Sequence, residues 1–476
     1  MGIKRYIATK DSTITNAFEA NLTTRATKAN MGASDILETF SIYGQATTSS
    51  AELSRILLEF PITTIVADRA SGKIPVSGSV SFFINLSNAP HGETTPKDFE
   101  LVVTPISRSW TEGYGLDMEA YDDRGGVNWL SASSGSLWTA EGGDHLSAPA
   151  YTASFVHGDE DLQIDISPLV EDWIASTIDN NGVMVKLGDT FESSSTDSFF
   201  TKRFFGRRSE HFYKTPWIEA RFDSSIKDNR NSFWVSSSLV PAEDNLMTLF
   251  LYNRTRKGLR NIPAVGTGSI YMSLFSGTLA PAGSELLLHT NETAITGGFS
   301  STGIYTASVA VQTTATTLFD VWHNNLTGSS RVEFFTGSAI AVNQFSGSDQ
   351  FELSNYVLNI TNLKPEYSTE ETARFRLFTR EKDWSPTIYT LVVADIENEA
   401  IEDAYFKVFR VIDDFDVIPY GTGSDNHTLL SYDKEGNYFD FDMSVLEPDY
   451  QYGLQFTFKQ EDEFYEQSET FKFRVR

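Results

Sequence analysis

The stretch that decides the fold is Leu446-Glu-Pro-Asp-Tyr-Gln-Tyr-Gly-Leu-Gln-Phe-Thr-Phe458. Its first half favours a tight change of chain direction, because Pro448 and Asp449 are turn-forming residues. From Leu454 onward, apolar and polar residues alternate one by one, which is the periodicity of a β-strand with one buried face. A turn followed directly by an alternating strand predicts an antiparallel sheet at this point of the chain.

Short apolar runs of the same kind recur along the chain. Clusters of Gly, Pro, Asn and Asp, which favour turns, separate them. Short strands with frequent turns are typical of β-sandwiches, whereas βαβ units would place a helix after almost every strand. We therefore predict an all-β, multidomain fold, with strands in the runs 55–60, 80–84, 99–103, 183–187, 306–311, 317–323 and 331–335.

One segment has a helical pattern instead. Ser167 is the expected N-cap, and Pro168 suits the first helical position because its ring fixes a helical φ. Asn180-Asn181-Gly182 is expected to end the helix, since these residues tolerate the left-handed conformation. The apolar residues of one helical face are Leu169, Val170, Trp173 and Ile174.

Composition excludes several classes of protein. The 476 residues include 37 Lys and Arg against 64 Asp and Glu, a net charge of −27. A chain this acidic does not suit a protein that grips phosphate backbones or anionic membranes, and no long apolar stretch predicts membrane insertion. Because Cys is absent, the chain has no disulfide, thiolate zinc site or cysteine nucleophile. Hydrophobic residues at 40% and aromatic residues at 13% favour large folded cores.

Charge is spread unevenly along the chain. Residues 1–225 contain 30 acidic and 18 basic residues, residues 226–350 contain 8 and 7, and residues 351–476 contain 26 and 12. Polar stretches near 224–231 and 346–350 read as short linkers at the two shifts. We therefore expect three domains, over 1–225, 226–348 and 349–476.

Two tyrosines at strand starts suggest the type of the second and third domains. Tyr305 follows the turn at Gly303, and Tyr452 follows the Leu446-x-Pro448 step. A tyrosine after a tight turn resembles the tyrosine corner of immunoglobulin-like sandwiches, and the Leu-x-Pro…Tyr step resembles fibronectin type III domains. The resemblance implies an immunoglobulin-like sandwich over 226–348 and an acidic immunoglobulin or fibronectin-III-like sandwich over 349–476.

The first domain resembles another family. Its motifs occur in the order of DNRLRE-type domains, which are jelly-roll β-sandwiches related to some carbohydrate-binding modules. The resemblance implies a jelly-roll domain over 1–225, whose tryptophans 110, 129, 138 and 173 would fill the core. The motifs that carry it are Lys10-Asp11-x-Thr13-Ile14, Asn30-x-Gly32-x-Ser34, Arg55–Phe60, Trp110-Thr-Glu112-Gly113, Asn128-Trp129, Trp138, Gly142-Gly143-Asp144, Asp165–Trp173, Asn181–Leu187 and Pro216-x-Ile218-Glu219.

Four further segments are similar to virion structural proteins of tailed bacteriophages, especially T4-like phages of marine bacteria. They are 115–129, Phe319-Asp-Val-Trp322 with Phe335-Thr-Gly337-Ser338, 371–377 and 450–454. The resemblance implies a structural component of the tail, neck or baseplate that assembles in the bacterial cytoplasm. Its expected partners are other virion proteins and copies of itself, and direct nucleic-acid binding is not expected.

An acidic segment is a candidate metal site. Asp117, Glu119, Asp122 and Asp123 could together hold Ca²⁺, because this ion prefers several carboxylate and carbonyl oxygens on a turn. The segment lacks the residue order of an EF-hand, so a solvated loop is the alternative. Asp122 and Asp123 do not suit a glycosidase pair, since adjacent strand residues point to opposite faces.

A basic cluster in the charge-poor second domain is the candidate docking site. Arg254, Arg256, Lys257 and Arg260 place four positive charges within seven residues. They could dock an acidic neighbour, such as the third domain of another copy, and a solvated loop is the alternative.

No hydrolase motif, P-loop or metal-spaced His pair occurs, so we expect no enzyme activity and no cofactor apart from that Ca²⁺. Three other hypotheses stay open. The first is an adhesin whose residues 1–225 bind a host-surface glycan, with Trp110 as one candidate stacking residue. The second is an envelope-acting hydrolase. The third is a non-viral surface protein.

Overall fold

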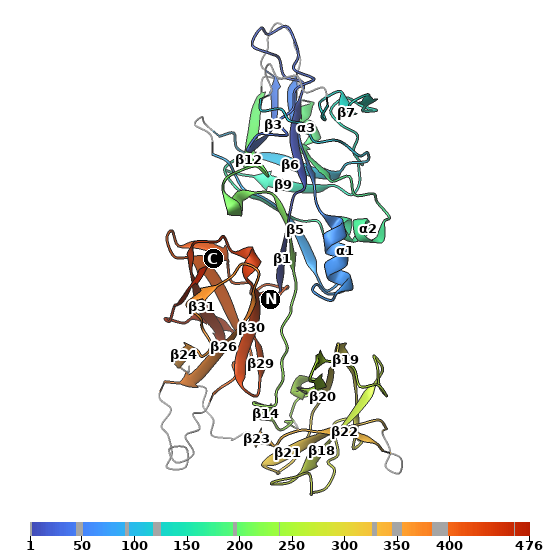
Figure 1. The fold of residues 1–476 in the computed structure, drawn as a ribbon, viewed down its shortest axis with the longest axis vertical. Helices are drawn as coiled ribbons and strands as arrows, with labels where there is room; N and C mark the ends of the chain where they lie inside the picture. The colour runs from blue at the N-terminus through green and yellow to red at the C-terminus, as the bar shows by residue number, and fades with distance from the viewer. Residues whose placement is uncertain are drawn as a thin grey trace. The chain divides into compact units, whose positions relative to one another are not determined.

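The computed structural model describes residues 2–43, 51–90, 95–117, 125–193, 198–237, 239–325, 331–344, 355–382, 398–460 and 462–476. Strands account for 44% of the structure and helices for 8%, which confirms the all-β, multidomain prediction (Figure 1). Contacts between residues divide the chain into two compact units. The N-terminal unit holds Gly2–Asp223 with Gly423–His427, and the C-terminal unit holds Ser224–Thr422 with Thr428–Arg476.

Antiparallel sheets form the N-terminal unit. One sheet has the order β1 (Ile3–Ile7), β13 (Trp217–Arg221), β5 (Ser81–Leu86) and β10 (Leu162–Asp165). The other has the order β12 (Ser198–Phe205), β3 (Ile36–Tyr43), β4 (Glu52–Glu59), β11 (Val183–Leu187), β6 (Phe99–Pro105) and β9 (Tyr151–Phe155), and β2 (Lys10–Thr15) pairs with β4. A small hairpin joins β7 (Ser131–Ser133) to β8 (Ser136–Leu137).

The larger of these sheets is buried on both faces. Ile56 and Leu58 of β4 point into the main core, whereas Leu57 points to the opposite face, as strand alternation requires. There Leu57 joins a second cluster with Trp110, Trp129 and Trp138. The four tryptophans are buried as predicted, but only Trp173 belongs to the main core. The prediction that all four fill one sandwich core is therefore wrong, because the other three pack on the outer face of the sheet together with Ile106, Val127 and Ala132.

The predicted helix is α2 (Ser167–Ala175), with Leu169, Val170 and Trp173 buried. Its expected ends are wrong. Ile166 occupies the N-cap position, because the Ser167 hydroxyl donates to Asp165 and accepts from the Phe82 N–H. The helix stops at Ser176, whose φ of 59° is left-handed, before the predicted 180–182.

Helix α1 (Ile62–Ala70) was missed, since its β-branched residues favour strands, and it packs against α2 (Figure 1). A third, four-residue helix, α3 (Asp189–Glu192), follows β11 directly. One-turn 3₁₀ helices are η1 (Phe212–Lys214), η2 (Ala242–Asn245) and η4 (Met443–Val445).

The first half of the C-terminal unit is a curled sheet around one core. Its order is β14 (Phe233–Trp234), β23 (Ile340–Asn343), β21 (Thr317–His323), β18 (Ile270–Ser276), β19 (Ile295–Ser301), β20 (Ile304–Val309) and β15 (Met247–Tyr252), and β22 (Glu333–Thr336) pairs with β21. The hairpin β16 (Arg254–Thr255) and β17 (Gly258–Leu259) follows β15. Strand β21 has the predicted bounds.

The second half contains two further sheets. One has the order β24 (Tyr356–Ile360), β26 (Thr372–Glu381), β30 (Gly436–Asp442) and β29 (Ser431–Asp433). The other has the order β25 (Glu366–Tyr367), β33 (Phe471–Val475), β31 (Gln451–Gln460), β27 (Ala404–Arg410) and β28 (Phe415–Ile418), and β32 (Glu463–Glu466) pairs with β31. Buried phenylalanines fill the space between them, as the stacked pair Phe406 and Phe439 shows with ring centroids 4.3 Å apart.

The two predicted tyrosine corners differ. The buried Tyr452 hydroxyl donates to the Glu447 carbonyl at 2.7 Å, five residues upstream, which is the geometry of a tyrosine corner. The buried Tyr305 hydroxyl instead accepts from the Ile262 N–H at 3.0 Å and donates to the Gly266 carbonyl at 2.8 Å. Tyr305 therefore fixes a distant loop rather than its own turn.

The segment near 224–231, read from the sequence as a short linker, is hydrogen-bonded along its length. The Asp228 N–H donates to the Tyr432 carbonyl at 3.1 Å, and the Asn229 N–H donates to the Thr248 carbonyl at 2.9 Å. It therefore ties β29 to β15 inside the C-terminal unit. The other expected linker, 346–350, lies outside the described residues, and the three predicted domain boundaries stay a prediction. Across the described ranges, no helix has the length and apolar character needed to cross a bilayer.

Candidate functional site

The predicted calcium site is described only in part. Asp117 is exposed, while Glu119, Asp122 and Asp123 lie outside the described residues. Within the described ranges, no three His, Asp or Glu side chains come together in a way that could hold a metal ion. Calcium at this loop stays a prediction.

The predicted docking cluster forms a short hairpin. Arg254 begins β16, Arg256 and Lys257 form the turn, and Arg260 follows β17. The Arg260 N–H donates to the Asn253 carbonyl at 3.1 Å, and the Asn253 side chain donates to the Arg260 carbonyl at 2.6 Å. These bonds close the base of the hairpin. We call residues 254–260 the basic hairpin.

The cations of the basic hairpin have no acidic partner among the described residues. All four side chains are exposed, and no ion pair joins any of them to the described Asp and Glu residues. Four like charges within seven residues repel one another, so the hairpin contributes little to the stability of its own domain. Its charge is available to a partner.

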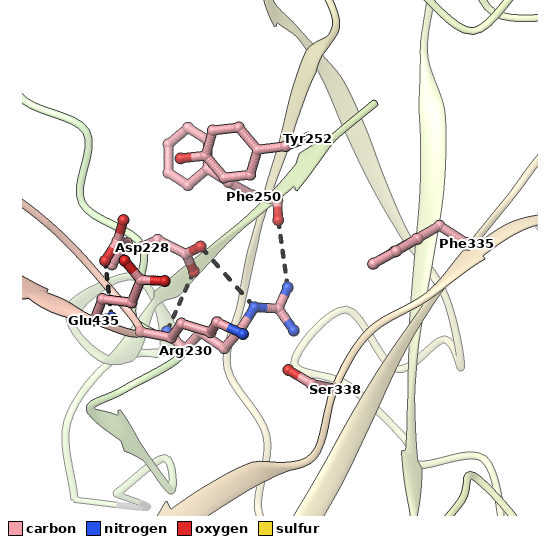
Figure 2. A pocket seen from close by; sticks show the side chains of 9 residues that line it. Asp228, Arg230, Phe250, Tyr252, Phe335, Ser338 and Glu435 are labelled. Carbon is pink, nitrogen blue, oxygen red and sulfur yellow. Dashed lines mark hydrogen bonds and ion pairs between the residues drawn. The ribbon is translucent and has the colours of Figure 1, made fainter. Parts of the chain in front are cut away.

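A cavity of about 250 Å³ lies in the C-terminal unit, and Figure 2 shows the side chains that line it. Strand β15 supplies Phe250 and Tyr252, and Tyr252 is only two residues from Arg254. The segment before β15, the strand β22 with the residues after it, and the β29–β30 turn complete the wall. The lining residues are Asp228, Arg230, Phe250, Tyr252, Phe335, Ser338, Asp433, Lys434 and Glu435.

Arg230 forms the floor and is already paired. Its two terminal nitrogens contact both carboxylate oxygens of Asp320, at 2.5 and 2.7 Å, and one of them also donates to the Phe250 carbonyl. The Trp322 indole N–H donates to the same Asp320 carboxylate at 2.7 Å. Asp320 is fully buried, so this bidentate pair neutralises the Arg230 charge.

Asp228 is the lining carboxylate whose contact with a cation is longest. It is 3% exposed, accepts from the Arg230 backbone N–H at 3.2 Å, and lies 4.0 Å from the nearest Arg230 side-chain nitrogen. Burial raises its pKa to about 6, although the Arg230 guanidinium and the Arg230 backbone N–H lower it; the nearby carboxylates Asp320 and Asp433 raise it further. A proton or a further cation would therefore stabilise the buried Asp228 carboxylate.

The other charged lining groups sit on the β29–β30 turn. Asp433 forms a bidentate pair with Arg376 at 2.8 and 2.9 Å, and Glu435 lies 3.3 Å from Arg376. Lys434 is exposed at the rim. Counting Asp320 and Arg376 with the lining groups, four carboxylates face three cations.

Aromatic rings form two walls of the cavity. Figure 2 shows Phe250 and Tyr252 on one side of the Arg230 guanidinium and Phe335 on another. The Phe250 and Tyr252 ring centroids are 6.3 Å apart with 29° between the ring planes. Tyr252 is 38% exposed and Phe335 43% exposed, so both rings can contact a ligand.

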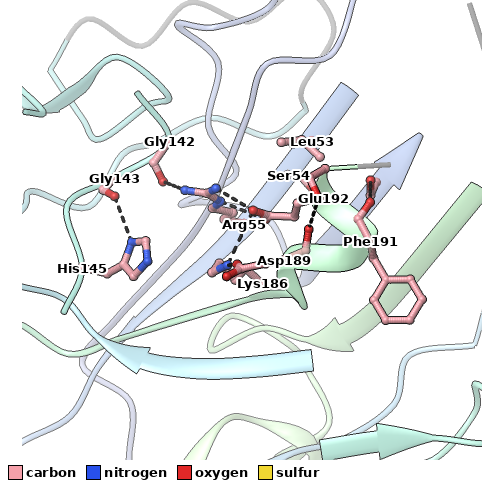
Figure 3. A network of polar contacts seen from close by, with 12 residues as sticks. Leu53, Ser54, Arg55, Gly142, Gly143, His145, Lys186, Asp189, Phe191 and Glu192 are labelled. Carbon is pink, nitrogen blue, oxygen red and sulfur yellow. Dashed lines mark hydrogen bonds and ion pairs between the residues drawn. The ribbon is translucent and has the colours of Figure 1, made fainter. Parts of the chain in front are cut away.

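A second charged group, in the N-terminal unit, is fully paired (Figure 3). Arg55 forms a bidentate contact with Glu192 at 3.0 and 2.7 Å and donates to the Gly142 carbonyl at 2.9 Å. Lys186 contacts Asp189 and lies 3.7 Å from Glu192. These contacts fix α3 to β4 and β11, so the group has a structural role.

Sequence reasoning found the basic hairpin but missed the pocket, because its walls come from three distant segments. One signal was present: Lys227, Asp228 and Arg230 place charges in a segment read as a linker. Trp110, a candidate sugar-stacking residue, is 3% exposed and its indole N–H donates to the Asn181 carbonyl at 2.9 Å. It cannot present a face to a glycan.

Comparisons with known proteins give no family. No family model matches the chain, and no curated protein matches it. Solved structures that it matches include E. coli alpha-2-macroglobulin in its native conformation, with 8% identity and a TM-score of 0.16, covering 98% of this chain and 28% of that one. Another is a mutant of Salmonella alpha-2-macroglobulin, with 9% identity and a TM-score of 0.15, covering 92% of this chain and 25% of that one. A third is Salmonella alpha-2-macroglobulin after reaction with methylamine, with 8% identity and a TM-score of 0.14, covering 98% of this chain and 28% of that one. This chain spans about a quarter of their length, and likenesses this weak carry no argument.

Proposed function

We propose that the chain is a non-enzymatic structural component of a bacteriophage virion, in the tail, neck or baseplate region. It acts in many copies as a β-sandwich spacer that docks to other virion proteins and to itself. The proposal rests on the sequence resemblance described above and on one structural observation, the basic hairpin.

That observation supports docking for an energetic reason. Four exposed cations without an acidic partner among the described residues project from a chain whose net charge is −27. Complementary charges on separate surfaces steer association and fix the register of two partners. In a protein this acidic, another copy is itself a suitable acidic surface.

The test is incorporation into particles. An epitope-tagged full chain, supplied during infection by the phage that carries the gene, should sediment with purified particles. A variant with Arg254, Arg256, Lys257 and Arg260 all changed to Glu should fold but stay in the soluble fraction. A wild-type chain that never enters particles would contradict the proposal. A chain needed for host adsorption but not for particle assembly would instead favour the adhesin.

A further inference from the structure

We propose that the pocket lined by Asp228, Tyr252 and Phe335 receives a guanidinium side chain from the basic hairpin of a second copy of this chain. The inference rests on the proposed docking function and deepens it, since it names the partner and the contact. It makes the hairpin and the pocket two halves of one interface.

The charges favour a cationic occupant. Arg230 is neutralised by Asp320, and Asp433 is neutralised by Arg376, each through two short contacts. Asp228 is left with a single cation at 4.0 Å, and its own side chain is buried, with 3% exposed. A cation entering the cavity would balance this carboxylate, and the attraction is stronger there than in water. Lys434 opposes entry only weakly, because it is exposed at the rim and screened.

The walls favour a guanidinium over an ammonium ion. A guanidinium is planar, weakly hydrated and stacks on aromatic faces, while its N–H groups match a carboxylate. Tyr252 and Phe335 supply exposed rings, and Asp228 supplies the acceptor. A cavity of about 250 Å³ is smaller than the usual 300–1,000 Å³ of drug-sized ligand pockets, so it suits one side chain.

The position of the hairpin favours a second copy as its source. Strand β15 ends at Tyr252 in the pocket wall, and β16 begins at Arg254. The hairpin that supplies the guanidinium and the strand that forms part of the receiving pocket are therefore adjacent in sequence. A two-fold symmetric contact requires one self-complementary patch, in which each copy gives and receives the same group. Arg256, at the hairpin turn, is the residue best placed to enter the partner's pocket.

The experiment measures dimerisation of the full chain by sedimentation velocity. Two pocket variants, Asp228→Asn and Phe335→Ala, and one hairpin variant, Arg256→Glu with Lys257→Glu, are compared with the surface control Asp244→Asn. Each test variant should raise the dimer dissociation constant by about tenfold or more, and the control should leave it unchanged.

Mixing the variants tests the pairing directly. The Phe335→Ala chain and the hairpin variant should form mixed dimers more readily than either forms alone, because one intact hairpin then meets one intact pocket. Methylguanidinium chloride should dissociate the wild-type dimer more than NaCl of equal concentration. If the pocket variants dimerise like the wild type while the hairpin variant does not, the pocket assignment is overturned and docking through the hairpin stands. If the hairpin variant also dimerises like the wild type, both the pocket assignment and docking through the hairpin are overturned.

Discussion

The charged network around Arg55 and the basic hairpin are opposite ways to use arginine. In the network, Arg55 and its partner Glu192 are 13% and 9% exposed, and every strong donor has an acceptor (Figure 3). In the hairpin, the arginines are exposed and have no ion-pair partner within the described residues. The buried pairs of the network connect elements within one domain. The exposed charges of the hairpin can instead contribute to binding an acidic partner.

The pocket lies between these extremes. Arg230 has a bidentate carboxylate partner like Arg55, whereas the neighbouring Asp228 contacts a cation only at 4.0 Å. Within this one cluster, Arg230 therefore contributes to folding stability, and Asp228 is the group proposed to bind a partner. Substitutions can test the separation, because they should change unfolding in one region and association in the other.

The largest effect is expected at Arg55. The Arg55→Ala substitution leaves Glu192 buried without its main partner and should cost about 3–5 kcal/mol of unfolding free energy. Lys73→Ala is the matched control in the same unit, since Lys73 is 59% exposed beside Asp68 and should cost below about 1 kcal/mol. Urea denaturation measures both. Equal losses in the two variants would show that the network is no more than a surface contact.

The next effect is a pH dependence at Asp228. Its folded pKa of about 6 lies above the ordinary value of 3.8, so the folded chain binds the proton more tightly. The unfolding free energy should therefore fall as the pH rises from about 4 to 6, by up to about 3 kcal/mol, and stay low above pH 6.

The Asp228→Asn variant should lack this fall. Asp11, whose pKa burial also raises to about 6, titrates in both chains, so the difference between their urea midpoints isolates Asp228. Parallel stability curves from pH 4 to pH 7 would contradict the assignment.

The smallest effect on stability is expected in the hairpin. Changing Arg254, Arg256, Lys257 and Arg260 to Glu should alter the unfolding free energy by less than about 0.5 kcal/mol, because the side chains are exposed and make no ion pair in the described part of the chain. Thermal unfolding at low protein concentration measures this. A large loss would mean that the hairpin belongs to its own domain's core structure.

Much of the fold follows from local patterns, and the pocket does not. The short apolar runs 317–323 and 183–187 predicted β21 and β11 with their observed bounds. Helix α1 escaped notice because Ile62, Thr63 and Ile65 favour strands when taken alone, whereas the helix buries Ile62 and Ile65 and packs beside α2.

The candidate site divides in the same way. The basic hairpin is contiguous, so its charge was visible in the sequence. The pocket joins Asp228, Phe335 and Asp433, which are more than 90 residues apart in sequence and meet only in the folded chain. The charge state of Asp228 depends on burial, which no sequence pattern records.

The most direct test of the central claim, docking through the hairpin, is sedimentation velocity of the wild-type chain over a range of protein and salt concentrations. We expect a reversible dimer at about 50 mM salt that dissociates as salt rises toward about 500 mM, because the Debye length shortens across that range. A monomer at every concentration, or a dimer indifferent to salt, would contradict it.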